Sequence, residues 1–460
     1  MKRFLTPILT MLLTLPVSLV AQQAPTLEEL VESALKKDHH LANRQLDIEA
    51  SQINRHQLRE AYLPHLDLSG KYAYLSSGLN VKAPANSVPE MGIALPPMDD
   101  AFTNRANLVT GGLKTEVLLY SGGKVPNMTK ALDQKITAQA AMLEKDRQEV
   151  IGEITAAYDK LALLKQVKAV LDESERRLAI NAETADKALG YGLITPYEHQ
   201  KIDVARAQLE SKIQQYEGKR YLLVNLLHQY SGLDTARIAR IDHDLEPAYP
   251  GHTGNDIGNR PEITALNAGI LAHQYQIKAA QSWWKPKVQA SASLGYINAF
   301  NVRFRAREPF PTGNTMALAT DKFEVVPNFS VGIGFKWDLF DGNKGKRETQ
   351  HARIGLQKAV NEKAEALEKL ELNLIKNQTE YTNALAEVKV RSKQKEAARN
   401  ALNQAVKEFK TGLIKASDLV GAEADYQNAS LDYLQAVYNQ RRTVVGLLQA
   451  TGSLHVRSLQ

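Results

Sequence analysis

The residues that most often carry chemistry in proteins are scarce in this chain or scattered along it. There is no cysteine, so thiol nucleophiles, disulfides and cysteine-bound metals are excluded. His39, His40, His199 and His273 are not spaced as a cluster of metal ligands on one helix face would be. No Gly-x-Ser-x-Gly segment marks an activated serine, and carboxylates occur as scattered charges rather than as catalytic pairs. We therefore expect no enzyme activity, no metal and no cofactor.

Residues 1–21 have the layout of a secretory signal peptide, with a basic start, an apolar stretch and Ala21 before the expected cut. A membrane anchor is the alternative, which the short length and Pro7 and Pro16 disfavour. Removal of this segment takes away two of the positive charges behind the formal net charge of +6. The remaining bias is too weak to indicate a nucleic-acid partner.

The chain reads as an internal duplication, which predicts one repeat over residues 22–256 and a second over 257–460, with an equatorial segment from about 233. Three short segments recur at a constant spacing of 220 positions, which chance does not explain. These pairs are Tyr120–Lys124 with Phe340–Lys344, Gly192–Ile194 with Gly412–Ile414, and Tyr230–Gly232 with Ala450–Gly452.

Each repeat is expected to form a helix, a strand, a long loop, a second strand, a very long helix, a turn and a last helix. The opening helices are predicted over about 26–62 and 257–284. Pro64 and Pro286 end them, because proline lacks the N–H that a helix needs and restricts the residue before it.

Apolar and polar residues alternate along four segments of about ten residues, most clearly from Phe329 to Leu339. Such strands are typical of a transmembrane β-barrel, although a half-buried soluble sheet alternates identically. Export and the aromatic residues at strand ends favour the barrel. Long loops at about 76–109 and 298–328 are interpreted as cell-surface lids. The lumen, or alternatively the rim, should be lined by Asp67, Lys71, Lys114, Glu116, Lys336 and Asp338.

Four strands cannot close a barrel, since known barrels begin at about eight. A dimer would supply eight strands and a trimer twelve, so the strand count demands an oligomer without deciding its order. Two segments, 124–190 and 343–410, are almost free of proline and glycine and predict helices roughly 100 Å long. Their heptad seams, which start near Ile136 and Val360, indicate coiled-coil packing.

Taken together, these features resemble the TolC-like outer-membrane efflux protein family over essentially all of the mature chain. The resemblance rests on the duplication, the Leu119–Lys124 and Leu339–Lys344 junctions, the strand-entry prolines and the Gly-Leu turns. It implies a mixed α/β membrane protein: a homotrimer with a twelve-stranded barrel in outer-membrane lipid and a helical tunnel across the periplasm. It further implies an exit channel of an efflux pump or a type I secretion system, served by a periplasmic adaptor and an inner-membrane pump. A non-conducting periplasmic scaffold is the alternative.

The resemblance also implies roles for particular residues. The adaptor would dock on the turns Tyr191-Gly192-Leu193 and Thr411-Gly412-Leu413, whose first positions depart from the valine of the family. The periplasmic gate falls on Phe409, Asp418 and its first-repeat counterpart Glu198. A gate arginine and a second aspartate of the family are replaced here by Ile414 and Gly421. Asp418 either contributes to an acidic ring on the channel axis, which would favour cations, or is a helix-terminal charge. The junctions between strands and helices are assigned to Pro64, Pro286, Gly122 and Gly342.

Overall fold

The computed structural model of the chain describes residues 23–84, 86–88, 93–95, 97–251, 256–306 and 317–456. The expected signal peptide lies outside this range. The chain divides into two compact units. A helical unit contains the residues up to Glu49, Ile136–Gly269 and the residues from Ala359 onward. A sheet unit contains Ala50–Lys135 and Ile270–Lys358. Each unit therefore draws on both predicted repeats, whose boundaries stay a prediction.

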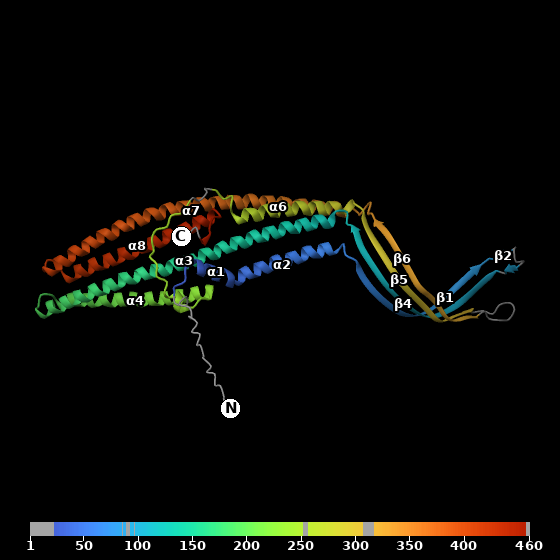
Figure 1. Ribbon diagram of the computed structural model, residues 1–460, viewed down its shortest axis with the longest axis horizontal. Coiled ribbons are helices and arrows are strands. Elements are labelled where there is room, and N and C mark those ends of the chain that lie inside the picture. Colours follow the sequence, from blue (N-terminus) through green and yellow to red (C-terminus); the bar gives the residue numbers. More distant parts are fainter. Residues whose placement is uncertain are drawn as a thin grey trace, which may run out of the picture. The chain divides into compact units, whose positions relative to one another are not determined.

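Helices account for most of the chain, and their bounds agree closely with the expected ones (Figure 1). They are α1 (Leu27–Lys37), α2 (His39–Glu60), α3 (Lys124–Gly190), α4 (Pro196–Ser231), α5 (Thr235–Ile238), α6 (Pro261–Ala280), the 3-10 helix η3 (Gln281–Trp284), α7 (Lys344–Lys410) and α8 (Ala416–Ala450). Within the described residues, none of these helices has the length and apolarity needed to cross a membrane.

The first predicted helix, over 26–62, is in fact two helices that meet at Asp38. Thr26 caps α1, since its hydroxyl accepts the backbone N–H of Glu29 at 3.2 Å. The carboxylate of Asp38 accepts the backbone N–H of Leu41 at 2.8 Å. An aspartate that caps a new helix in this way competes with continuation of the old one, which explains the break.

The heptad seam of α3 lies inside the core of the helical unit. Ala157, Leu164, Leu171, Leu178 and Ala185 are all 7% exposed or less, and they pack in one cluster with apolar residues of α1 and α4. The seam predicted on α7 is less covered: Leu374 and Leu402 are buried, whereas Val360 is 41% exposed. In the single chain, the seam of α3 is therefore more fully buried than the seam of α7.

The sheet unit contains a four-stranded antiparallel sheet in the order β1-β4-β5-β6 (Figure 1). Its strands are β1 (His65–Ala83), β4 (Met98–Tyr120), β5 (Lys287–Ala306) and β6 (Ala317–Lys336), and β2 (Asn86–Val88) pairs separately with β3 (Ile93–Leu95). The strands are 19 to 23 residues long, twice the expected length. The loops expected at 76–109 and 298–328 are therefore wrong over much of their extent, because backbone pairing continues through polar residues whose side chains lack clear alternation. Their location at the cell surface stays a prediction.

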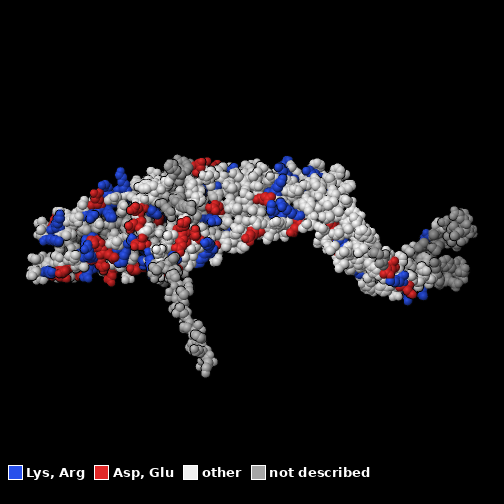
Figure 2. Space-filling view, viewed as in Figure 1, with Lys and Arg blue, Asp and Glu red and all other residues white. Residues whose placement is uncertain are grey.

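The register of the sheet brings the predicted apolar positions onto one face. One row across the four strands is Leu68, Leu113, Leu294 and Phe329, and the next is Asp67, Lys114, Ser293 and Ser330. Neighbouring rows point to opposite faces, since side chains alternate along a strand. Figure 2 shows few charged side chains over the middle of the sheet.

The apolar face is left open by the sheet unit itself. Leu68 is 83% exposed, Phe329 68% and Ile333 75%. Contiguous apolar surface of this kind marks a surface that another molecule or lipid covers.

Candidate functional site

The two turns that join the long helices have the same backbone geometry. Gly192 and Gly412 have φ of 68° and 72°, a left-handed conformation that glycine adopts without strain. In each turn the glycine N–H donates three residues back, to Leu189 at 2.9 Å and to Phe409 at 3.0 Å. No atom lies within 4 Å of a Cβ added at either glycine, so the dihedral alone requires glycine.

Large side chains project from these turns. Tyr191 is 81% exposed, and Leu193 and Leu413 are each 76% exposed. Thr411 is exposed as well, and its hydroxyl donates to the carbonyl of Glu408 at 3.0 Å. The expected docking residues therefore form two exposed tips with apolar content.

The acidic residues assigned to the gate have different partners in the two repeats. Thr195 caps α4 by accepting the backbone N–H of Glu198 at 3.2 Å. The carboxylate of Glu198 reaches the other hairpin, where it accepts the backbone N–H of Ser417 at 3.1 Å. Asp418 instead accepts the backbone N–H of Lys415 at 3.2 Å, at the start of its own helix. This contact gives Asp418 the helix-terminal role, and the acidic ring stays a prediction.

Phe409 packs into its own hairpin. It is partly buried against the cluster of Leu402, Ala405 and Leu419, together with Ile414. Ile414 thus belongs to the same apolar cluster as Phe409. The gate role of Phe409 stays a prediction.

Sequence reasoning missed an ion pair that joins the two hairpins. Arg177 of α3 makes a two-pronged contact with Glu423 of α8, with Nε to Oε2 at 2.9 Å and Nη2 to Oε1 at 2.8 Å. The Glu423 side chain is only 7% exposed. Glu173 also pairs with Arg177 at 2.8 Å, and the guanidinium lies 5.1 Å from the ring centroid of Tyr426. The spacing of Glu173 and Arg177 was a readable helix signal, whereas the partner on α8 had no signal.

His199 is held between two carboxylates near the first turn. Its Nε2 lies 2.5 Å from Asp186 of α3, and its Nδ1 lies 3.3 Å from Asp203 of α4. The hydrogen bond to Asp186, aided by the charge of Asp203, raises the pKa of the His199 imidazole. Among the described residues, no three or more histidine, aspartate or glutamate side chains, this trio included, are arranged so that they could hold a metal ion.

The junction residues lie where the sequence places them. Pro64 directly precedes β1, and Pro286 directly precedes β5. Gly122 and Gly342 have φ of 69° and 70° at the strand-to-helix turns. A Cβ at Gly122 would lie 3.1 Å from Cβ of Lys285, so close approach adds to the requirement there.

The predicted lumen residues are only partly brought together. Asp67 pairs across the strands with Lys114, which forms an ion pair with Glu116. Lys71 lies further along β1, opposite Thr110. Lys336 is the last residue of β6. Asp338 lies beyond the end of β6, 3.9 Å from Lys336. The ladder between β5 and β6 ends two residues before Asp338, and its assignment to the lumen, or alternatively to the rim, stays a prediction.

Comparison with known proteins decides the family. The model of the outer membrane efflux protein family matches residues 30–233 and 255–453. The chain belongs to the outer membrane efflux protein family.

Relatives of this family share modest sequence identity with the chain. It is 21% identical over 358 residues to the outer membrane efflux protein BepC of Brucella suis, covering 75% of this chain and 72% of that protein. It is 25% identical over 300 residues to the outer membrane protein OprJ of Pseudomonas aeruginosa, covering 59% of this chain and 55% of OprJ.

Solved structures share the fold. The outer-membrane channel OprN superimposes with a TM-score of 0.71 at 17% identity, over 94% of this chain and 90% of that one. VceC of Vibrio cholerae gives a TM-score of 0.69 at 20% identity, over 93% of this chain and 96% of that one. The expected family and fold class are confirmed, as are the efflux-channel function and the location in the outer membrane with an extension into the periplasm. Family and fold are those of transport channels.

Proposed function

We propose that three copies of this outer membrane efflux protein form one exit channel, fed by an inner-membrane pump through a periplasmic adaptor. The observation that carries the proposal is the open sheet. Among the described residues, β1 pairs only with β4 and β6 only with β5, so both edges have free backbone groups. Edge strands of this length must be paired or covered. Pairing β6 of one copy with β1 of the next satisfies both edges.

The same arrangement accounts for the two faces of the sheet. The row containing Leu68 and Phe329 would meet lipid, and the row containing Asp67 and Lys114 would meet water. Burying apolar area stabilises by about 25 cal/mol per Å², so lipid contact is the favourable environment for the first row. Charged residues are tolerated in the second row because a channel interior is wet.

Disulfide cross-linking tests the assembly, since the natural chain has no cysteine. Ser69→Cys on β1 would be combined with cysteine at Asn328, Ser330 or Gly332 on β6. We expect at least one combination to give a covalent trimer on a non-reducing gel. Ser293→Cys on the inner strand β5 is the matched control and should stay monomeric. If the cross-linked species on the gel are no larger than a dimer, the proposed trimer is contradicted.

The adaptor is proposed to dock on the two turns. Exposed apolar side chains surrounded by charged helices are typical of interaction sites. Tyr191→Asp together with Leu193→Asp should abolish export in cells while single-channel conductance in bilayers persists. Tyr249→Asp serves as the control, because Tyr249 is similarly exposed, at 72%, but lies away from the turns. Export that survives the double change would argue against docking there.

A further inference from the structure

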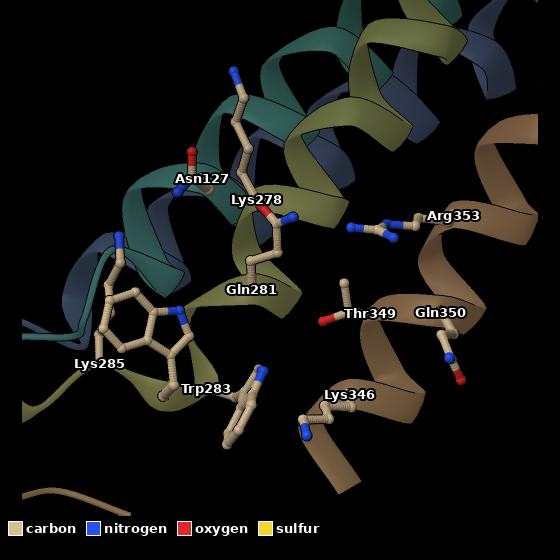
Figure 3. A pocket seen from close by; sticks show the side chains of 10 residues that line it. Asn127, Lys278, Gln281, Trp283, Lys285, Lys346, Thr349, Gln350 and Arg353 are labelled. Atoms are coloured by element: carbon tan, nitrogen blue, oxygen red, sulfur yellow. The ribbon is translucent and has the colours of Figure 1, made fainter. Parts of the chain in front are cut away.

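A basic and aromatic pocket lies in the sheet unit, next to the start of β5 (Figure 3). It is lined by one residue near the end of α6, three of the four residues of η3, the residue that follows η3, the first turns of α7 and one residue of α3. Its volume is about 630 Å³, which falls in the size range of small-ligand sites. Its lining residues belong neither to the sheet edges β1 and β6 nor to the two turns.

Four cationic side chains line the pocket: Lys278, Lys285, Lys346 and Arg353. No aspartate or glutamate is among the lining residues, and none of the four cations has an ion-pair partner in the described parts of the chain. Elsewhere on the first turn of α7, Lys344 is 4.0 Å from Glu348. The pocket therefore holds positive charge that the protein itself does not neutralise, and such a cluster attracts anions.

Polar groups in the pocket are arranged across the gap between the helices. Figure 3 shows the amide of Gln281 from η3 and the guanidinium of Arg353 from α7 pointing toward one another, with Thr349 of α7 close by. Arginine presents several N–H donors in a planar fork that fits phosphate oxygens. Amide and hydroxyl groups beside it suit the ester and hydroxyl oxygens of a headgroup.

Two indoles form the side of the pocket next to the strand. A Cβ added at Gly345 would overlap the indole of Trp283, so glycine lets this ring lie directly on α7. The indole N–H of Trp337 donates to the carbonyl of Trp284 at 2.8 Å. The ammonium of Lys285 lies 6.0 Å from the ring centroid of Trp284. Tryptophans placed beside cations at the start of a membrane strand are typical of the interface between lipid and water.

We propose that this pocket binds the phosphate headgroup of an anionic phospholipid in the periplasmic leaflet of the outer membrane. The inference rests on the proposed function, which places the start of β5 at that leaflet. A lipid is favoured over a free anion because the indoles offer an apolar wall beside the cations. A free phosphate would gain nothing from that wall, whereas a lipid can rest its glycerol and first methylenes against it.

Native mass spectrometry of the purified trimer tests the proposal, with phosphatidylglycerol, phosphatidylcholine and inorganic phosphate as probes. We expect phosphatidylglycerol to be retained in preference to phosphatidylcholine. The variant with Lys346→Gln and Arg353→Gln should bind it roughly 30-fold more weakly, since each cation near an anionic surface contributes about fivefold. The matched control, Lys389→Gln with Lys407→Gln, removes the same charge from α7 far along the helix and should bind normally.

The charge-preserving variant with Lys346→Arg and Arg353→Lys separates binding from misfolding and should keep most of the affinity. Equal retention of the two lipids, or an equal loss in the control, would overturn the proposal. Displacement of phosphatidylglycerol by inorganic phosphate at comparable concentration would reassign the pocket to a free anion. Bilayer conductance of the same wild-type sample is measured separately. If conductance is absent, the channel proposal fails, whatever the lipid result.

Discussion

The turn that ends the first long hairpin and the turn that ends the second share a backbone but not their side-chain contacts. Both have a left-handed glycine with the same hydrogen bonds. In the first repeat, Glu198 bonds across to the other hairpin and His199 sits between two aspartates. At the matching positions of the second repeat, Asp418 caps its own helix and Leu419 is buried. The two turns therefore share the dihedrals that glycine adopts without strain and differ in their polar contacts, a difference that the predicted duplication would allow.

Of the contacts between the α3–α4 hairpin and the α7–α8 hairpin, the ion pair between Arg177 and Glu423 should contribute most to stability. Arg177→Gln leaves Glu423 buried without a partner and should destabilise the helical unit by roughly 3 kcal/mol. Thermal melts of the detergent-solubilised protein measure the loss. The double variant with Arg177→Met and Glu423→Met should recover most of it. A single variant as stable as the wild type would show that the hairpins are held together elsewhere.

Because the two turns have the same backbone conformation, the same substitution should lower the free energy of unfolding equally in each. Gly192→Ala and Gly412→Ala should each cost about 1 kcal/mol, since the left-handed conformation is strained for alanine although space is available. Gly218→Ala, inside α4 and with no neighbouring atom within 4 Å, is the control and should stabilise. Clearly unequal costs at the two turns would contradict their equivalence.

The two acidic residues should respond differently to neutralisation. Glu198→Gln weakens a contact between hairpins, and Asp418→Asn weakens a local cap, each by about 0.5–1 kcal/mol. Only Asp418→Asn should also lower the cation preference of the channel, if three copies surround the axis. Reversal potentials in a salt gradient measure that preference. An unchanged reversal potential leaves Asp418 with its capping role alone.

The smallest effect concerns pH and should appear only at the first turn. The pKa of His199 is raised in the folded chain, so its contribution to stability is fully present below the unfolded value near 6.5. That contribution is lost as the pH rises through the folded pKa. Melting temperature should therefore fall slightly over that interval in the wild type. The slope should vanish in His199→Gln and persist in Leu419→Met, the control at the matching position.

The bounds of the two long helices could be predicted from the sequence almost to the residue, because proline, glycine and heptad spacing act locally. Lys124–Gly190 and the strand starts after Pro64 and Pro286 follow from such signals. The pairing of Arg177 with Glu423 could not be predicted, because 246 positions separate the partners. Strand length was underestimated because backbone hydrogen bonds do not depend on alternating side chains. The break at Asp38 was missed because, in the sequence alone, an aspartate that caps a helix cannot be distinguished from an aspartate on a helix surface.

The long strands have a consequence for how the molecule meets its surroundings. About 20 residues tilted at roughly 45° rise near 45 Å, whereas the apolar band of such proteins is about 25 Å tall. On these dimensions, about 20 Å of the sheet would extend beyond the apolar band. That stretch holds Lys82 with Asp99 and Lys322 with Glu324, and Figure 2 shows charged side chains gathered toward that end of the sheet. In the proposed assembly, a molecule that approaches the cell from outside would meet this charged rim before it reached any lipid.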